Sequence, residues 1–227
     1  MKVVVSIGGS VLAPDSAGRV AAHANVFEGL DDDGHDLGVV VGGGSTAREY
    51  IATARELGAN ETELDQIGIA VTRLNARLLV GALDDRAAPT PPESYDEARA
   101  AMRRGDVPVM GGTEAGHTTD AVAAALAEYV EADRLVYATS VSGVFDADPS
   151  EDPDATRHES LTVRELVSLV GSRELEAGIN VPVDLLAAKL LQRAGVRAVV
   201  VDGTDPEAIA RAVRGTHDGT DILPDEA

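Results

Sequence analysis

The chain opens on KVVVSIGGS at residues 2–10, an apolar run that ends in paired glycines and a serine. Valine and isoleucine favour extended backbone, and glycine at the end of such a run is typical of a tight turn. Other short apolar runs follow, each ending in Gly, Ser, Thr or Asp. We therefore predict five strands, at residues 2–7, 37–41, 107–110, 135–139 and 197–201.

Longer amphipathic segments lie between these runs. Residues 64–78 carry apolar side chains at spacings of three and four, which places them on one face of a helix. Thr162 and Glu165 fit a capping box that opens another helix. Residues 121–130 and 185–194 complete the expected helices.

The alternation of strands and helices decides the expected architecture. Such alternation favours a mainly parallel sheet with helices on both faces, a three-layer α/β/α sandwich. No break in composition and no long linker divides the chain. We therefore predict an α/β fold with a single domain over residues 1–227.

The composition excludes several classes of protein. The 227 residues carry a formal net charge of -20, which argues against nucleic acid as a partner because binding it requires a basic surface. No apolar run reaches the roughly 20 residues needed to cross a membrane, and the start lacks a signal-peptide pattern. The absence of cysteine leaves the cytoplasm as the expected compartment.

Nearly all of the basic residues are arginine. Lys2 and Lys189 are the only lysines, whereas Asp and Glu together number 39. This pattern is typical of adaptation to a salty cytoplasm, where charges are screened over about 3 Å at 1 M salt. An acidic protein without that adaptation is the alternative.

Three glycine clusters each follow a predicted strand: Gly8-Gly9-Ser10, Gly42-Gly43-Gly44 and Gly111-Gly112-Thr113. The carboxyl ends of parallel strands share one edge of a sheet, where ligands usually bind. Glycine lets backbone N–H groups approach a phosphate closely, and a following helix N-terminus favours the anion. One cluster could serve a tight turn alone. Three clusters with adjacent hydroxyls favour phosphate binding.

Other nucleotide motifs fit less well. No G-x-x-x-x-G-K-[ST] occurs, which excludes a P-loop enzyme. Residues 42–47 match the dinucleotide pattern G-x-G-x-x-[GA], and Asp65 lies about 20 residues on. That acid should end the next strand, however, and Asp65 falls within a helical pattern. A dehydrogenase is therefore a poor second reading.

Nucleophile–base arrangements are not evident either. No G-x-S-x-G occurs, and the histidines show no metal-ligand spacing. We expect His23, His35, His158 and His217 on the surface. His117 lies directly before an apolar helix, where lining a pocket and leading into the helix are equally compatible with its position.

Five segments together resemble the amino-acid-kinase superfamily, and within it the UMP kinase branch in its shorter archaeal form. They are Gly8 to Leu12, Val41 to Gly44 with Ala47-Arg48, Pro108 to Thr113, Gly116 to Ala121 and Thr139 to Phe145. They occur in the family's order, and the resemblance runs from Met1 to Thr220. It implies Mg²⁺-dependent transfer of the ATP γ-phosphate to UMP, an acceptor-side half near residues 1–130, an ATP-side half near 131–227, and a homohexamer.

The resemblance also implies roles for individual residues. Those expected at ATP are Gly9, Ser10, Gly44, Arg48, Thr139, Phe145 and Asp148. Those expected at UMP are Gly43, Asp65, Thr113, Glu114, Ala115, Gly116, His117, Thr118 and Thr119. Mg²⁺ would be held by phosphate oxygens and water, with no dedicated protein metal site.

The chain departs from the family at a charged position. Many members have lysine just before the first glycine pair, where this chain has Ser6. Transition-state charge must then be met by Mg²⁺, backbone N–H groups, Arg48 or another cation. Lys189 is a candidate, although an exposed helix position explains it equally well. Asp120 is the second catalytic candidate; it and Asp184 could orient cations or cap helices.

The adenosine-side loop departs as well. Ser142 stands where an aspartate is common, and Phe145 where a tyrosine is common. The lost hydroxyl predicts altered discrimination between purine nucleotides. Two further readings stay open: a family kinase with a carboxylate, carbamate or isoprenoid phosphate acceptor, and a non-catalytic nucleotide-binding or storage protein on the same fold.

Overall fold

The computed structural model describes residues 1–12, 16–173 and 182–225. Its strands are β1 (Lys2–Ile7), β2 (Asp36–Val41), β3 (Val109–Met110), β4 (Arg134–Thr139), β5 (Ser160–Thr162), β6 (Arg197–Asp202) and β7 (Thr220–Leu223). Its helices are α1 (Gly9–Leu12), α2 (Ala17–Asp32), α3 (Gly44–Glu56), α4 (Glu61–Leu83), α5 (Tyr95–Arg104), α6 (Thr119–Tyr129), α7 (Val163–Arg173), α8 (Leu185–Ala194) and α9 (Pro206–Arg214), with a short 3-10 turn at Asp84–Arg86.

The strands form one seven-stranded sheet in the order β3-β2-β1-β4-β6-β7-β5. All neighbouring strands are parallel except β6 and β7, which are antiparallel. Strand β4 is the middle strand, and β1 lies beside it, paired with β2 on one side and with β4 on the other. Strands β1 to β3 therefore form one side of the sheet and β4 to β7 the other, and the two groups meet between β1 and β4.

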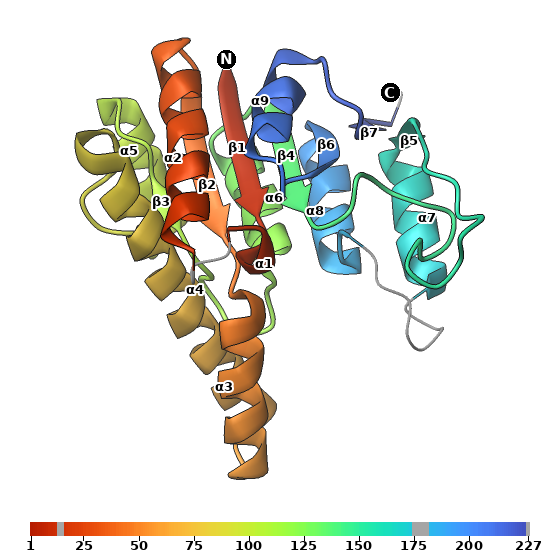
Figure 1. Cartoon of the computed structure of the whole chain (residues 1–227), viewed down its shortest axis with the longest axis horizontal. Helices are drawn as coiled ribbons and strands as arrows, with labels where there is room; N and C mark the ends of the chain where they lie inside the picture. The colour runs from red at the N-terminus through yellow and green to blue at the C-terminus, as the bar shows by residue number, and fades with distance from the viewer. Residues whose placement is uncertain (13–15, 174–181, 226–227) are drawn as a thin grey trace.

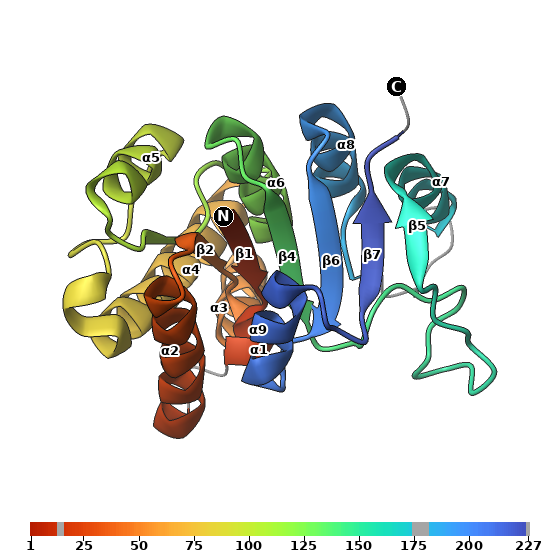
Figure 2. The ribbon, with the colours of Figure 1, turned by 90° about the horizontal axis from the view of Figure 1, so that it is seen from above.

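Helices cover both faces of this sheet. Alternate side chains of the strands pack with α1, α2, α9 and the end of α4 on one face, and with α5, α6, α7 and α8 on the other. Figure 2 shows these two layers on either side of the strands. Helix α3 packs on α4, and the pair projects beyond the sheet in Figure 1. The three-layer α/β/α sandwich with a mainly parallel sheet is confirmed.

The five predicted strands are all present, whereas β5 and β7 were not predicted. They have three and four residues, too few for an alternating pattern to stand out. The capping box is confirmed, because Glu165 N donates to Thr162 Oγ1 over 3.2 Å and Glu165 Oε2 accepts from Thr162 N. No helix within the described residues has the length and apolar character to span a membrane.

The surface assignment was wrong for His23, and His35, His158 and His217 are only partly exposed. His23 is fully buried beneath α2, with Nδ1 2.9 Å from the carbonyl of Arg19 and Nε2 3.0 Å from that of Gly203. The contact with Gly203, 180 residues away, could not be seen in the sequence. It joins α2 to the turn after β6.

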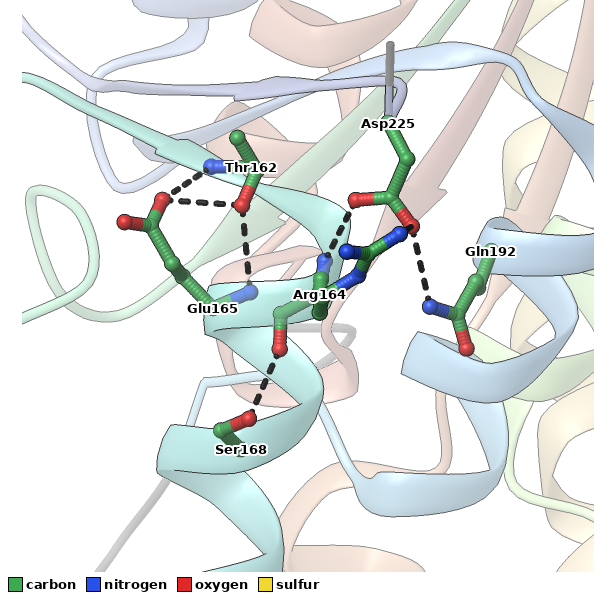
Figure 3. A network of polar contacts seen from close by, with 6 residues as sticks. All are labelled: Thr162, Arg164, Glu165, Ser168, Gln192 and Asp225. Carbon is green, nitrogen blue, oxygen red and sulfur yellow. Dashed lines mark hydrogen bonds and ion pairs between the residues drawn. The ribbon is translucent and has the colours of Figure 1, made fainter. Parts of the chain in front are cut away.

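The end of the described chain is tied to two helices. Asp225 accepts hydrogen bonds from the backbone N of Arg164 on α7 and from Gln192 Nε2 on α8, over 3.2 and 3.1 Å (Figure 3). These bonds hold the pKa of Asp225 below its usual value, the Gln192 bond most strongly. Asp225, which follows β7, thus links α7 and α8 through hydrogen bonds.

Candidate functional site

A pocket of about 590 Å³ opens at the carboxyl ends of β1, β2 and β4. In Figure 1 the short helix α1 lies directly beyond the arrowhead of β1 at this edge. Its described lining combines glycine turns, helix N-termini and the loop after β4: Gly8, Gly9, Ser10, Val11, Gly42, Gly43, Gly44, Arg48, Thr118, Thr119, Asp120, Ala138, Thr139, Ser140, Val141, Gly143, Phe145, Ala147, Asp148, Pro149 and Pro182.

The first two glycine turns touch through their backbones. A Cβ on Gly9 would lie 2.2 Å from Gly44 N and 2.5 Å from Gly42 O, closer than atoms can approach. Gly44 begins α3 with φ of 66°, a left-handed conformation that favours glycine. Asn75 Nδ2 donates to Gly42 O over 2.9 Å and holds the second turn from behind. Glycine is therefore required here by packing, and the result is a wall rich in backbone N–H groups.

Arg48 supplies the only lysine or arginine side chain in the described lining. It stands on the second turn of α3, and its Nη2 lies 3.3 Å from Ser10 Oγ as donor. The guanidinium thus faces the loop after β1, where an incoming phosphate would meet it. A planar guanidinium suits phosphate because it offers several donors in a fixed arrangement.

Two carboxyl groups, those of Asp120 and Asp184, lie at the N-terminus of α6. Thr118 caps the helix by accepting from Ala121 N over 3.1 Å, and its hydroxyl donates to Asp184 Oδ2. Asp184 in turn caps α8 by accepting from Ala187 N over 3.0 Å. The expectation that an acid here caps a helix is confirmed for Asp184.

Asp120 does not cap a helix; it lies in the first turn of α6 and lines the pocket. Its Oδ1 accepts from Ser6 Oγ over 2.7 Å. Burial raises the pKa of Asp120 to about 6; the charge of Asp184 adds to this rise and the Ser6 bond opposes it. Burial, with the charges of Asp120 and Asp184, raises the pKa of Tyr137 on β4 well above its usual value.

A hydroxyl deep in the second half shapes the loop after β4. Thr220 is fully buried; its Oγ1 accepts from Val144 N over 2.9 Å and donates to His158 O over 2.6 Å. Gly143 has φ of 152°, and a Cβ there would lie 2.5 Å from Thr220 Oγ1. Phe145 forms an antiparallel bridge with Arg157. The loop that carries the expected adenosine-side residues is therefore held in place by Thr220 on β7.

The third glycine cluster packs against α4. A Cβ on Gly111 would lie 2.5 Å from Thr72 Oγ1, and Gly112 N donates to that same oxygen over 2.8 Å. Farther along, Gly116 N donates to Asp65 Oδ2 over 2.8 Å. These contacts bring Asp65 to the segment after the cluster, although the two are 51 residues apart.

The pocket joins every residue that the resemblance placed at ATP, together with Gly43, Thr118, Thr119 and Asp120. The remaining residues placed at UMP lie outside its lining: Asp65 on α4, and the segment Thr113, Glu114, Ala115, Gly116 and His117, which Gly116 joins to Asp65. Lys189 is exposed on α8 and is not part of the lining. The described structure thus separates the two cations proposed for catalysis, with Arg48 in the pocket and Lys189 outside it.

Pro182 and the bond between Ser6 and Asp120 are among the site features that were not predicted. Pro182 lines the pocket from the start of the α8 segment, and nothing in the sequence pattern indicated it. Ser6 holds Asp120, and a signal was present: it is the one polar residue between Val3 and Ile7 in an otherwise apolar strand. A buried hydroxyl needs a partner, so its position implied a polar neighbour.

Comparison with known families gives the wider context. Residues 1–202 match the model of the amino acid kinase family. The chain belongs to this family. The uridylate kinase of Haloarcula marismortui is 66% identical over 99% of this chain and 100% of its own length, and that of Halobacterium salinarum is 63% identical over 99% and 94%.

Solved structures agree with the fold. The uridylate kinase of Archaeoglobus fulgidus superimposes with a TM-score of 0.89 at 47% identity and covers 98% of this chain and all of its own. Aspartate kinase from Synechocystis gives a TM-score of 0.79 at 21% identity, covering the whole of this chain and 40% of its own, which shows the fold alone.

Proposed function

We propose that the chain is a UMP kinase that transfers the γ-phosphate of ATP to UMP and releases UDP and ADP. The observation that carries the proposal is the single pocket that joins two glycine turns, Arg48 and the N-terminus of α6 at the ends of the parallel strands. Relatives with 62–66% identity over nearly the whole chain bear the name uridylate kinase. Geometry supports phosphate chemistry, and the relatives support the acceptor.

Within this proposal the two nucleotides occupy adjoining regions. ATP lies along the Gly9–Ser10 turn, Gly44, Arg48 and the loop from Thr139 to Asp148. UMP lies between Gly43, the Thr118–Thr119 turn and the segment from Thr113 to His117, which Asp65 holds through Gly116. The boundary between the acceptor-side and ATP-side halves then falls near the centre of the sheet, between β1 and β4, within one domain.

The proposed chemistry needs no base. A phosphate monoester has its second pKa near 6, so the UMP oxygen is already ionised at neutral pH. The protein needs only to align two polyanions and to stabilise charge in a loose transition state. Backbone N–H groups of the glycine turns and the Arg48 guanidinium are the groups placed to do so.

We propose that Mg²⁺ enters with ATP. No group of three or more His, Asp or Glu side chains within the described residues is arranged to hold a metal ion. This fits a cation bound mainly by phosphate oxygens and water, which Mg²⁺ prefers in nucleotide sites. The bound ion would neutralise the phosphate charge that Arg48 alone leaves unbalanced.

The acceptor is tested by a direct assay. Purified protein at high salt with Mg²⁺ and ATP should phosphorylate UMP and leave CMP, AMP and carbamate largely unchanged. A family kinase with another acceptor would prefer carbamate, a carboxylate or an isoprenoid phosphate. A non-catalytic nucleotide-binding protein would bind ATP without turnover. Failure to convert UMP above background contradicts the proposal.

A single substitution tests which residue sets the preference for ATP or GTP as phosphate donor. Phe145 lines the pocket where the family commonly has tyrosine. Restoring the hydroxyl with Phe145→Tyr adds one possible hydrogen bond, about 1 kcal/mol, which corresponds to a change of about fivefold in the ratio of kcat/KM for ATP and GTP. An unchanged ratio would show that this ring does not read the purine.

We also propose a cytoplasmic homo-oligomer, a hexamer by resemblance. Helices α3 and α4 leave large apolar side chains exposed, Tyr50 and Leu57 on the α3 side, Leu74 and Leu78 on α4, with 62%, 84%, 57% and 45% of their surface accessible. Large apolar side chains exposed on two adjoining helices favour contact with another protein surface. Light scattering at high salt measures the number of subunits, and a monomer would contradict this part of the proposal.

A further inference from the structure

Ser6 is a buried polar residue in the middle of the sheet. It is 2% exposed, and its neighbours across the strands are Val40 and Tyr137. A hydroxyl that is shut off from water costs free energy unless it forms a hydrogen bond. Its Oγ meets that need by donating to Asp120 Oδ1 over 2.7 Å, although the two residues are 114 positions apart. The bond joins β1 to the first turn of α6.

A second carboxyl is held beside the first. Thr118, two residues before Asp120, donates its hydroxyl to Asp184 at the N-terminus of α8. Three elements, β1, α6 and α8, therefore meet through Ser6, Asp120, Thr118 and Asp184 at one side of the pocket. Of these, Asp120 and Thr118 line the pocket directly.

We propose that Ser6 is a positioning residue for phosphoryl transfer: its hydroxyl holds the Asp120 carboxyl on the pocket wall, beside the second carboxyl that Thr118 holds. The inference deepens the proposed function and rests on it. Ser6 itself does not line the pocket and acts through Asp120.

The consequence concerns the charge of Asp120. The groups that face it are Asp184 from α8, Tyr137 from β4 and Ser6 from β1, while Arg48 and Asp148 line the same pocket. Burial and Asp184 favour the neutral acid, whereas the Ser6 bond favours the carboxylate. An ionised carboxyl on the pocket wall attracts a cation in the pocket, and the neutral form does not. The bond from Ser6 therefore keeps a larger fraction of Asp120 ionised near neutral pH.

The protonation of Asp120 can be followed without substrate. Difference infrared spectra between the wild-type protein and Asp120→Asn isolate the C=O band of this carboxyl when it is protonated. We expect the band to disappear with a midpoint at pH about 6. Ser6→Ala should move the midpoint up and Asp184→Asn should move it down, because the two groups act in opposite directions. Asn retains the N-cap of α8, so Asp184→Asn keeps the helix.

The kinetic test compares kcat at saturating UMP and Mg-ATP across pH. Ser6→Ala should lower kcat about tenfold near pH 6, and the deficit should shrink above about pH 8, where Asp120 is ionised in both proteins. The comparison at each pH removes the titration of UMP itself. Ser6→Thr keeps the hydroxyl and should restore kcat. Ser168→Ala, which removes a hydroxyl from the exposed face of α7, is the matched control and should match the wild type.

The outcomes separate the two proposals. A midpoint that Ser6→Ala leaves in place, or a kcat deficit that is equal at every pH, overturns the positioning role. Wild-type turnover in Asp120→Asn overturns it as well, while UMP kinase activity stands. A wild-type protein without UMP turnover overturns the proposed function, and the infrared midpoints still decide whether Ser6 controls Asp120.

Discussion

The two halves of the molecule build their parts of the pocket in different ways. In the half before β4, backbone packs on backbone, and Gly9 meets Gly42 and Gly44 with no room for a side chain. In the half from β4 onward, a buried side chain holds the loop after β4, because the Thr220 hydroxyl bonds to the backbone of Val144 and His158. The Gly9 turn is therefore limited by direct contact between backbone atoms, whereas the loop after β4 depends on one buried hydroxyl. Substitutions can test this difference.

The largest effect is expected from Gly9→Ala. Its Cβ would meet Gly44 N at 2.2 Å, and these are backbone atoms that cannot rotate away. We expect kcat/KM to fall by more than about 100-fold and the free energy of unfolding to fall by about 2–4 kcal/mol. A coupled assay and denaturant unfolding measure both.

Gly29→Ala is the matched control. Gly29 lies within α2, and a Cβ there meets no heavy atom within 4 Å. Alanine in a helix interior should stabilise the protein by about 0.5–1 kcal/mol and leave turnover alone. Equal behaviour of the two variants would remove the distinction between close packing and ordinary glycine.

The second effect concerns the charge that the first half supplies. Arg48→Met removes the only lysine or arginine in the described lining, and we expect kcat to fall about 100-fold or more. Arg48→Lys should recover only part of it, because an ammonium lacks the planar donor pair. Lys189→Met measures the other candidate, and a larger loss there than in Arg48→Met would transfer the role to Lys189.

Thr220→Val probes the second half with a substitution of nearly equal shape. It leaves the backbone N of Val144 and the carbonyl of His158 without their partner. We expect the free energy of unfolding to fall by about 1–3 kcal/mol and the KM for ATP to rise severalfold, with the KM for UMP within about twofold. Thr53→Val, at an exposed hydroxyl on α3, is the control. A rise in both KM values would show that the halves are not independent.

The smallest effect is expected at the edge of the second half. The pKa of Asp225 is lowered in the folded protein, so its carboxylate stabilises the fold above the unfolded value near 3.9, and the contribution is lost as pH falls through the folded pKa. Asp225→Asn should therefore lower Tm slightly at neutral pH, and the difference should vanish in strong acid. A Tm gap that is independent of pH would assign the effect to packing.

The pocket gathers all of the residues expected at ATP and only some of those expected at UMP. Most residues expected at ATP end strands or lie in the first turns of helices, or follow β4 in its loop, so the common edge of a parallel sheet brings them together. Asp65 and the segment from Thr113 to His117 lie in a helix and a loop whose pairing depends on how α4 packs. Helix packing of this kind leaves no periodic signal. The same reason hid the burial of His23, whose partner is 180 residues away.

The sequence by itself predicted five strands of the sheet and the glycine turns that follow them, and it favoured phosphate binding there, because apolar runs that end in glycine are local patterns. Only the tertiary structure decided which residues share the pocket. Arg48 and Lys189 are both cations on helices, and chain packing places one inside and one outside. Likewise, Ser6 and Asp120 become partners only when β1 and α6 meet. Burial in this packing raises the pKa of Asp120 to about 6, and the bond from Ser6 opposes the rise. Local patterns depend on neighbouring residues, whereas the charge state of a buried group depends on whatever the fold brings next to it.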